Sequence, residues 1–260
     1  MERNITVVKI GGNVIDNEAA LQRFVADFAA LPSPKILIHG GGKLATRLAE
    51  RLEVPTTMIG GRRVTDAATI EIVTMVYAGG VNKRIVAALQ AAGCNALGLS
   101  GADANMIPAV RRSPVPVDYG FVGDIDATKI NVPMLGVMLD AGITPIFCAI
   151  THDGEGTLLN SNADSVASAV AVAASSLAPT DLVICFEKQG VLADVADEGS
   201  VILHISKADF EPLCASGVVS QGMIPKVENA LKACESGVRS VVIKHSERLL
   251  ECGSGTKITL

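Results

Sequence analysis

Runs of consecutive apolar residues alternate along this chain with segments whose apolar residues recur every three or four positions. The uninterrupted runs are typical of buried strands, and the spaced segments are typical of helices that cover a sheet. The pattern predicts strands over residues 7–10, 35–38, 95–99, 144–149, 157–159, 182–186 and 240–243. It predicts helices over residues 18–30, 43–52, 70–76, 82–92, 132–141, 164–176, 207–215 and 226–236. Strands that alternate with helices in this way indicate an α/β fold with a largely parallel sheet.

Two of the predicted strands run directly into glycine turns. The first turn contains Gly11 and Gly12, with Lys9 at the end of its strand, and the second contains Gly41 and Gly42. Glycine lets backbone N–H groups approach a phosphate or carboxylate closely, and ligands of parallel sheets bind at the carboxyl ends of strands. We therefore predict one anion site shared by both turns. Taken alone, the first turn fits a plain strand-to-helix connection with an exposed lysine equally well.

The second turn also satisfies a relaxed dinucleotide-binding pattern, GxGxxA, over residues 40–45. In a dinucleotide-binding fold the first strand carries this pattern, and an acidic residue follows about 20 positions later. The chain meets neither condition, and it contains no GxxxxGK[ST] sequence. A split anion site is therefore the better interpretation.

Four charged residues stand beside glycine-rich or helix-capping turns and are the catalytic candidates: Lys9, Arg63, Asp164 and Lys226. Arg63 can hold a carboxylate with two parallel hydrogen bonds. Lys226 falls in the first turn of a predicted helix, where a positive charge is unfavourable unless an anion is near. Asp164 opens another helix, so it is either a helix cap or a partner that fixes Lys9 and Lys226.

Composition limits the possible functions of the 260-residue chain. We expect two lobes, residues 1–178 and 179–260, divided near Pro179. The net charge of −5 and the aromatic content of 3% argue against nucleic acid as a partner. The uncharged stretch between Asp164 and Asp181 is too short for a membrane span. Six widely spaced cysteines and no leader before the first strand predict a cytoplasmic protein, and the scattered histidines predict no metal cluster.

These motifs together resemble the acetylglutamate kinase family of the amino-acid kinase superfamily. The resemblance covers nearly the whole chain. The arginine-Val-Thr segment that begins at Arg63, together with residues 98–103, narrows it to acylglutamate. The matching segments are residues 9–12, 39–42, 63–66, 82–83, 98–103, 120–124, 160–164, 222–226 and 255–258.

The resemblance implies a three-layer α/β/α sandwich, with N-acyl-L-glutamate bound by the N-terminal lobe and ATP with Mg²⁺ by the C-terminal lobe. The metal would be held mainly by the nucleotide phosphates. The implied substrate-binding residues are Gly41, Gly42, Arg63 and Asn160. The implied catalytic residues are Lys9, Lys226 and Asp164, and the implied phosphate-binding or nucleotide-binding residues are Gly11, Gly12, Gly190 and Gly222.

The implied reaction needs no general base, since the attacking γ-carboxylate is already ionised at pH 7. The task is to bring two anions together and to stabilise the charge on the transferred phosphoryl group. We expect the hairpin over residues 107–125 to line the acyl pocket. Without a long N-terminal extension, the resemblance also implies a homodimer that arginine does not inhibit.

One segment departs from the family pattern. Residues 186–189, Phe-Glu-Lys-Gln, replace a polar loop that usually follows the first strand of the ATP lobe. This departure supports one alternative, a non-catalytic sensor on the same fold. Two others stay open: N-succinyl-L-glutamate as the substrate, and a related carbamate, aspartate or glutamate 5-kinase. Carbamate has no α-carboxylate for Arg63 to hold. The chain also has no regulatory or RNA-binding domain of the kind found in the other two kinases.

Overall fold

The computed structural model describes residues 4–194, 196–219 and 223–260. Its strands are β1 (Ile5–Ile10), β2 (Lys35–His39), β3 (Met58–Ile59), β4 (Arg62–Arg63), β5 (Ala96–Leu99), β6 (Ala109–Arg111), β7 (Gly123–Ile125), β8 (Thr144–Cys148), β9 (Ile150–His152), β10 (Leu158–Asn160), β11 (Thr180–Phe186), β12 (His204–Ser206), β13 (Ser240–His245) and β14 (Thr256–Thr259). Its α-helices are α1 (Gly12–Ile15), α2 (Glu18–Ala30), α3 (Gly42–Arg51), α4 (Ala67–Thr74), α5 (Asn82–Ala91), α6 (Val132–Asp140), α7 (Ala163–Ser175), α8 (Lys207–Ala215) and α9 (Ile224–Glu235). A π-helical segment, η1 (Met75–Val81), joins α4 to α5, and three short 3₁₀ turns complete the elements: η2 (Asp103–Asn105), η3 (Ala127–Lys129) and η4 (Ser246–Arg248).

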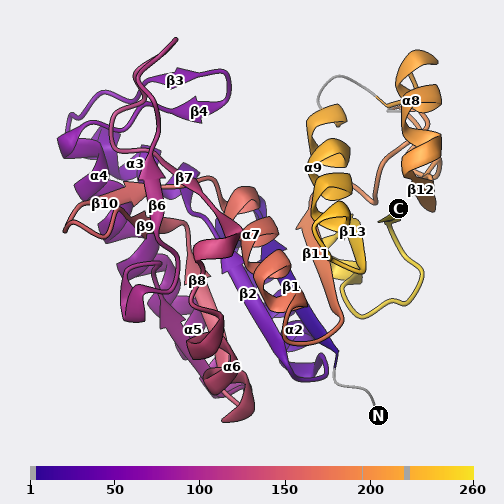
Figure 1. The fold of residues 1–260 in the computed structure, drawn as a ribbon, viewed down its shortest axis with the longest axis horizontal. Helices are drawn as coiled ribbons and strands as arrows, with labels where there is room; N and C mark the ends of the chain where they lie inside the picture. Colours follow the sequence, from indigo (N-terminus) through magenta and orange to yellow (C-terminus); the bar gives the residue numbers. More distant parts are fainter. Residues whose placement is uncertain (1–3, 195, 220–222) are drawn as a thin grey trace.

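An eight-stranded sheet runs through the whole molecule in the order β12-β14-β13-β11-β1-β2-β8-β5. Each neighbouring pair is parallel except β13 and β14, which are antiparallel. The strands before residue 178 form one half of the sheet, and those after it form the other (Figure 1). The halves join where β1 pairs with β11, with Ile5 opposite Thr180 and Ile10 opposite Cys185. The predicted largely parallel sheet is confirmed.

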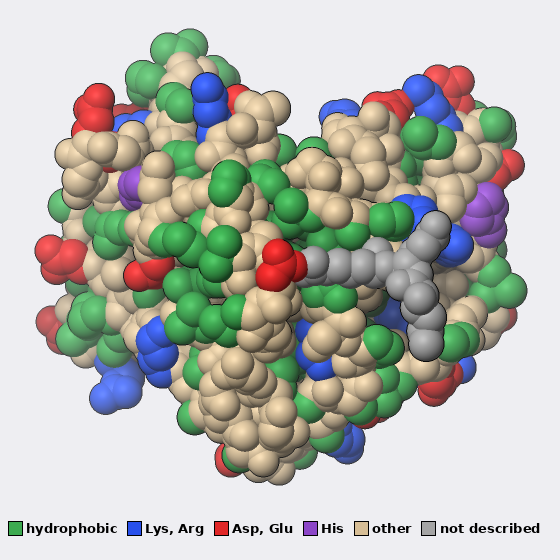
Figure 2. All heavy atoms as spheres, turned by 60° about the horizontal axis from the view of Figure 1, so that its bottom comes forward, with side chains coloured by type: hydrophobic (Ala, Val, Ile, Leu, Met, Phe, Trp, Pro, Cys, Tyr) green, Lys and Arg blue, Asp and Glu red, His purple; other side chains and the backbone are tan. Residues whose placement is uncertain are grey.

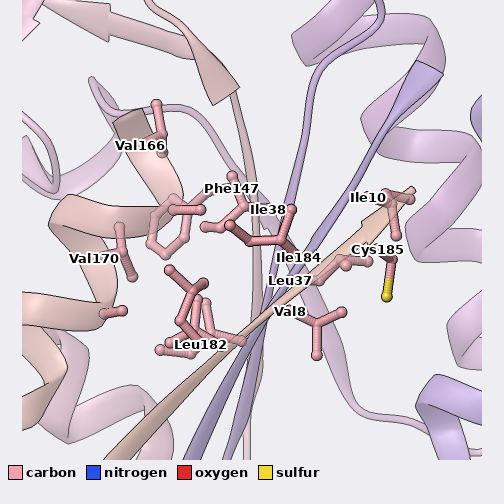
Figure 3. Close-up of a cluster of buried hydrophobic side chains, with 14 of the residues drawn as sticks. Val8, Ile10, Leu37, Ile38, Phe147, Val166, Val170, Leu182, Ile184 and Cys185 are labelled. Atoms are coloured by element: carbon pink, nitrogen blue, oxygen red, sulfur yellow. The ribbon is translucent and has the colours of Figure 1, made fainter. Parts of the chain in front are cut away.

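Side chains alternate between the two faces of this sheet, and helices cover both faces. Val166 and Val170 of α7 point toward Phe147 on one face (Figure 3). Val8 of β1 points from the opposite face, which α2 covers (Figures 1 and 3). Helices α6 and α9 contact α7, and α5 contacts α2. The predicted three-layer sandwich is therefore confirmed.

Short two-stranded sheets stand beyond the carboxyl ends of the strands. One hairpin pairs β6 with β7, which confirms the hairpin predicted over residues 107–125. A second pairs β3 with β4 and carries Arg63. The β3–β4 hairpin is drawn at the top of Figure 1, and β6 and β7 are drawn below it. The sequence pattern did not predict β3, β4, β9, β12 or β14, which are only two to four residues long.

The helix interrupted by Gly79 and Gly80 in the sequence is continuous in space. Residues 67–91 form one 25-residue helix, and the glycines lie inside its π-helical segment. This helix is long and apolar enough to span a membrane. The sequence pattern did not indicate it, because only the uncharged stretch between Asp164 and Asp181 was considered as a possible span. The helix is weak evidence for a span, because core helices pass the same test and 44% of its apolar window is buried in the protein.

Candidate active site

The carboxyl ends of β1 and β2 open into a cavity of about 390 Å³. In the space-filling view, the surface is notched at its upper rim between the two halves of the molecule (Figure 2). Seven of the predicted site residues line the cavity: Lys9, Gly11, Gly12, Gly41, Gly42, Arg63 and Asn160. The structure thus brings both glycine turns and the arginine hairpin together around one space.

Lys9 and Asp164 form an ion pair at the edge of this cavity. Lys9 alternates with Val8 and Ile10, so its side chain leaves the sheet on the face that α7 covers. Its Nζ lies 2.7 Å from Oδ1 of Asp164, in the first turn of α7. The lysine side chain is 13% exposed and the aspartate side chain 36%, so water screens this pair only in part.

Asp164 does not cap its helix, which excludes one of the two roles considered for it. The N-cap is Asn162, whose Oδ1 accepts hydrogen bonds from the N–H groups of Asp164 (2.8 Å) and Ser165 (3.2 Å). The amide therefore satisfies the helix end and leaves the Asp164 carboxylate available to Lys9. The negative charge also suits the first turn, where the helix dipole is positive.

The first glycine turn is held from both halves of the sheet. Gly11 is the N-cap of the short helix α1. The next side chain, Asn13, donates from Nδ2 to Glu187 (2.8 Å) and accepts from the Nζ of Lys43 on α3. Glu187 belongs to residues 186–189, the segment that departs from the family pattern. Despite this departure, the segment contacts the first glycine turn.

The second glycine turn is packed beneath an aromatic ring. Gly41 is the N-cap of α3, and a Cβ atom at this position would lie 2.9 Å from the ring of Tyr77. Tyr77 lines the cavity and comes from the π-helical segment η1, which the sequence pattern did not predict. Burial raises the pKa of Tyr77, so this side chain is an uncharged wall of the cavity.

Arg63 is tied to the second turn by its guanidinium group. One nitrogen, Nη2, donates to the carbonyl of Gly42 (3.0 Å) and to Oγ1 of Thr46 (2.8 Å), and Nη1 donates to Thr56 (3.3 Å). These bonds fix the planar group at the cavity wall. A pre-oriented guanidinium is suited to hold a carboxylate.

Asn160 lies on the wall formed by β10. It is buried, and its Nδ2 donates to Oγ1 of Thr65 (3.1 Å). Sequence analysis left open whether Thr65 or Asp66 caps α4. Asp66 is the cap, with its Oδ1 accepting from the N–H of Thr69 (2.8 Å). The Thr65 hydroxyl is therefore left to orient Asn160.

The β6–β7 hairpin contributes an ion pair that the motifs did not reveal. Arg112 holds the carboxylate of Asp124 with two nitrogens, and both residues line the cavity. Hydrogen bonding to Asp124 raises the pKa of Arg112. The only sequence signal for this ion pair was that both residues lie in a predicted hairpin. Which residues face each other across a hairpin depends on the register of its strands, so the pair itself was not predicted.

The remaining site candidates lie away from this cavity or outside the described residues. Lys226, in the first turn of α9, has its Nζ 4.4 Å from the ring centre of Phe186, the last residue of β11. Because β11 runs parallel to β1, Lys226 lies at the same side of the sheet as Lys9, where the strands have their carboxyl ends. Gly190 is buried away from the cavity, and a Cβ there would lie 2.8 Å from Oγ1 of Thr256. Gly222 lies outside the described residues.

Within the part of the chain that the structure describes, no three His, Cys, Asp or Glu side chains are grouped to hold a metal ion. The six cysteines are free, four of them buried. Burial raises the pKa of Cys148 and of Cys185 to about 12, so both stay protonated at neutral pH. These thiols are therefore suited to packing rather than to chemistry.

Comparisons with known proteins agree with this arrangement. A model of the amino acid kinase family matches residues 4–245. Acetylglutamate kinase of Phocaeicola vulgatus is 48% identical over 258 residues and 99% of both chains, and that of Cytophaga hutchinsonii is 49% identical over 96% of this chain and 94% of its own. A crystal structure from Streptococcus mutans superposes with a TM-score of 0.79 at 30% identity, over 98% of both chains. With such matches along its full length, and with a lysine–aspartate pair between two glycine turns, this chain belongs to the acetylglutamate kinase family.

Proposed function

We propose that the protein transfers the γ-phosphoryl group of ATP to the γ-carboxylate of N-acetyl-L-glutamate, a step of arginine biosynthesis. The Lys9–Asp164 ion pair at the edge of the cavity carries this proposal. A non-catalytic sensor would not require a lysine held in this way, so the intact pair also argues for an enzyme.

In this proposal the cavity of the N-terminal half, residues 1–178, binds the acylglutamate. Arg63 would pair with the α-carboxylate, Asn160 would donate to the substrate, and the amides of Gly41 and Gly42 would hold it from the second turn. The support is that all four residues line one cavity. The β6–β7 hairpin would close the acyl end, since its residues 122–125 line the same space.

The C-terminal half, residues 179–260, would bind ATP against the carboxyl ends of β11 and β13. Gly11 and Gly12 would face the γ-phosphate, and Lys226 would approach it from α9. Gly190 would act indirectly, because its close packing against Thr256 shapes the loop after β11. Gly222 would belong to the segment before α9.

The chemistry of the transfer rests on positive charge and on orientation. The attacking carboxylate is ionised at neutral pH, so the residues need not remove a proton. Lys9, oriented by Asp164, would neutralise charge that develops on the phosphoryl oxygens, and the glycine amides would add donors. A magnesium ion would accompany the nucleotide and neutralise its phosphates.

We also propose a cytoplasmic homodimer. Strand β5 is an outer strand of the main sheet, and Leu97 on it is 41% exposed. An open strand edge that carries an exposed apolar side chain is typical of an interface between two copies. Six free cysteines fit a reducing compartment.

A coupled ADP-release assay tests the activity. We expect turnover with N-acetyl-L-glutamate and ATP, and slower turnover with N-succinyl-L-glutamate. Glutamate without an acyl group and carbamate serve as controls for the other kinases of the superfamily. Absence of turnover with every acylglutamate in the panel would refute the proposal.

A further inference from the structure

Beneath the second glycine turn lies a chain of polar groups that the proposed reaction does not use. His39 is fully buried directly before the turn, and Asn82 is fully buried in the long helix. Lys83 reaches in from the surface. Buried polar side chains in apolar surroundings are costly unless they are paired, so this group requires an explanation.

The contacts run in one line from the surface to the turn. Nζ of Lys83 lies 3.1 Å from Oδ1 of Asn82 and 2.9 Å from the carbonyl of Gly98. Nδ2 of Asn82 lies 3.0 Å from Nε2 of His39 and 2.9 Å from the carbonyl of Ile146. Nδ1 of His39 lies 2.8 Å from the carbonyl of Gly40.

Hydrogen-bond chemistry gives this line a fixed direction. An ammonium group can only donate, so Lys83 requires the amide oxygen of Asn82 on its side. The amide NH₂ group must then face His39, which makes Nε2 of the imidazole an acceptor and leaves the proton on Nδ1. His39 therefore donates to the carbonyl of Gly40, and burial supports this neutral form by lowering the pKa of His39 to about 4.

The last bond in the line determines how the glycine turn presents its amides. The peptide that joins Gly40 to Gly41 is planar and trans, so the N–H of Gly41 points opposite to the Gly40 carbonyl. Fixing the carbonyl therefore fixes the N–H. A glycine turn without such an anchor can rotate its peptide planes easily, because glycine has no Cβ to restrict them.

We infer that Lys83, Asn82 and His39 form a positioning relay that orients the Gly40–Gly41 peptide for binding a substrate carboxylate. The inference rests on the proposed function, because it assigns the second turn to the acylglutamate. None of the three side chains is among the residues that line the cavity, so they are positioning residues and not catalytic ones.

The strand beside the relay is shaped to accommodate it. A Cβ atom at Gly98 would lie 2.0 Å from Oδ1 of Asn82 and 2.9 Å from Nζ of Lys83. Only glycine leaves room for the amide and the ammonium to meet here. The Asn-Lys pair and Gly98, which belong to separate motifs in the sequence, thus serve one purpose.

The first experiment reads the imidazole directly. Long-range ¹H–¹⁵N spectra of ¹⁵N-histidine-labelled protein distinguish the two neutral tautomers, and the chain has only four histidines to assign. We expect His39 at pH 7 as the Nδ1–H tautomer. A wild-type Nε2–H tautomer would overturn the relay.

The second experiment measures its effect on binding. For Lys83→Met we expect the KM for N-acetyl-L-glutamate to rise roughly 5–20-fold, with the KM for ATP unchanged and kcat within about threefold. Lys83→Arg keeps a donor and should stay close to wild type, and Gly98→Ala should reproduce the rise. The control Lys129→Met replaces an exposed lysine of η3 and should change nothing.

The outcomes separate the relay from the proposed function. A wild-type enzyme that turns over acetylglutamate, combined with an unchanged KM in Lys83→Met, refutes the relay alone. An equal loss for both substrates refutes it too, because that result indicates general destabilisation. If the wild type phosphorylates no acylglutamate, the proposed function fails, while the tautomer spectra still decide whether the relay exists.

Discussion

At the scale of single residues, the position of a charge matters more than its presence. Lys9 could have extended into water from the end of its strand, as exposed lysines usually do. Instead its ammonium is held 2.7 Å from the Asp164 carboxylate at the edge of a cavity. In the proposed reaction, a charge fixed in this way would need no reorganisation when a phosphoryl group arrives, which is how pre-oriented groups lower a barrier.

Replacing Lys9 therefore tests the catalytic role most directly. For Lys9→Ala we expect kcat to fall by ~10²–10⁴ with little change in either KM, because the lost charge acts mainly in the transition state. Steady-state ADP release measures both constants. A large rise in KM with kcat intact would assign Lys9 to ground-state binding instead.

Arg63 should show the opposite kinetic pattern. Its guanidinium is pre-oriented by Gly42 and Thr46 and would hold a carboxylate that takes no part in bond formation. For Arg63→Lys we expect the KM for acetylglutamate to rise roughly 10–100-fold with kcat nearly retained, since a lysine cannot form the paired hydrogen bonds. An effect on the KM for ATP alone would contradict this assignment.

His39 predicts how stability depends on pH. Desolvation first, and the nearby charge of Lys83 to a lesser extent, lower its pKa from 6.5 to about 4. Between these values the unfolded chain binds a proton at this site and the folded protein does not. The contribution of neutral His39 to the free energy of unfolding should therefore be fully present above pH 6.5. The free energy of unfolding should fall by up to ~3 kcal/mol as the pH decreases toward 4.

Urea unfolding between pH 7.5 and 4.5 measures this dependence. The window lies above the ordinary pKa of the carboxylates whose folded values are lowered, such as Asp181, so their loss of stability begins below it. His39→Gln should flatten the curve in this window. A wild-type free energy that stays constant from pH 7 to 4.5 would contradict the buried neutral form.

At the scale of elements, the first turn of α7 has a structural task and, in the proposed reaction, a chemical one. Asn162 caps the helix, and Asp164, two residues later, orients Lys9. The two tasks can be separated because different side chains perform them. This division was not evident from the sequence, where Asn162 and Asp164 are equally plausible caps.

A matched pair of substitutions tests the division. Asn162→Ala should lower the free energy of unfolding by ~0.5–2 kcal/mol, because two helix N–H groups lose their acceptor. Asp164→Asn should leave stability nearly unchanged but lower kcat by ~10-fold or more, since Lys9 loses its partner. Chemical denaturation and ADP release give the two measurements. Equal effects on stability from both variants would show that Asp164 also serves the helix end.

The elements also show which features a sequence can and cannot predict. Helices α2 and α8 have the predicted ends, because each has a polar cap directly before a periodic apolar segment. The π-helical segment around Gly79 was missed, because local propensity indicates a break there and only packing keeps the helix continuous. As a result, Tyr77 was not recognised as a wall of the cavity.

At the scale of the whole molecule, parallel topology does most of the assembly. Residues separated in sequence, such as Gly11 and Gly41, meet because β1 and β2 are parallel neighbours that end on one side of the sheet. The glycine turns and the buried apolar runs were sufficient to predict a site at the carboxyl ends of these strands. The cross-strand pair of Arg112 with Asp124 depends on hairpin register, and the relay from Lys83 depends on side-chain direction. Neither can be derived from periodicity.

The open edge of the same sheet leads to the last prediction. Strand β5 pairs only with β8 among the described strands, and Leu97 on it is exposed. If two copies associate through this edge, Leu97→Glu places like charges opposite each other and should shift the protein from dimer to monomer. Analytical ultracentrifugation measures the shift. Leu203→Glu, an equally drastic change at a residue 65% exposed near β12, should leave the dimer intact. A wild-type monomer would refute the dimer, and a dimer that persists in Leu97→Glu would place the interface elsewhere.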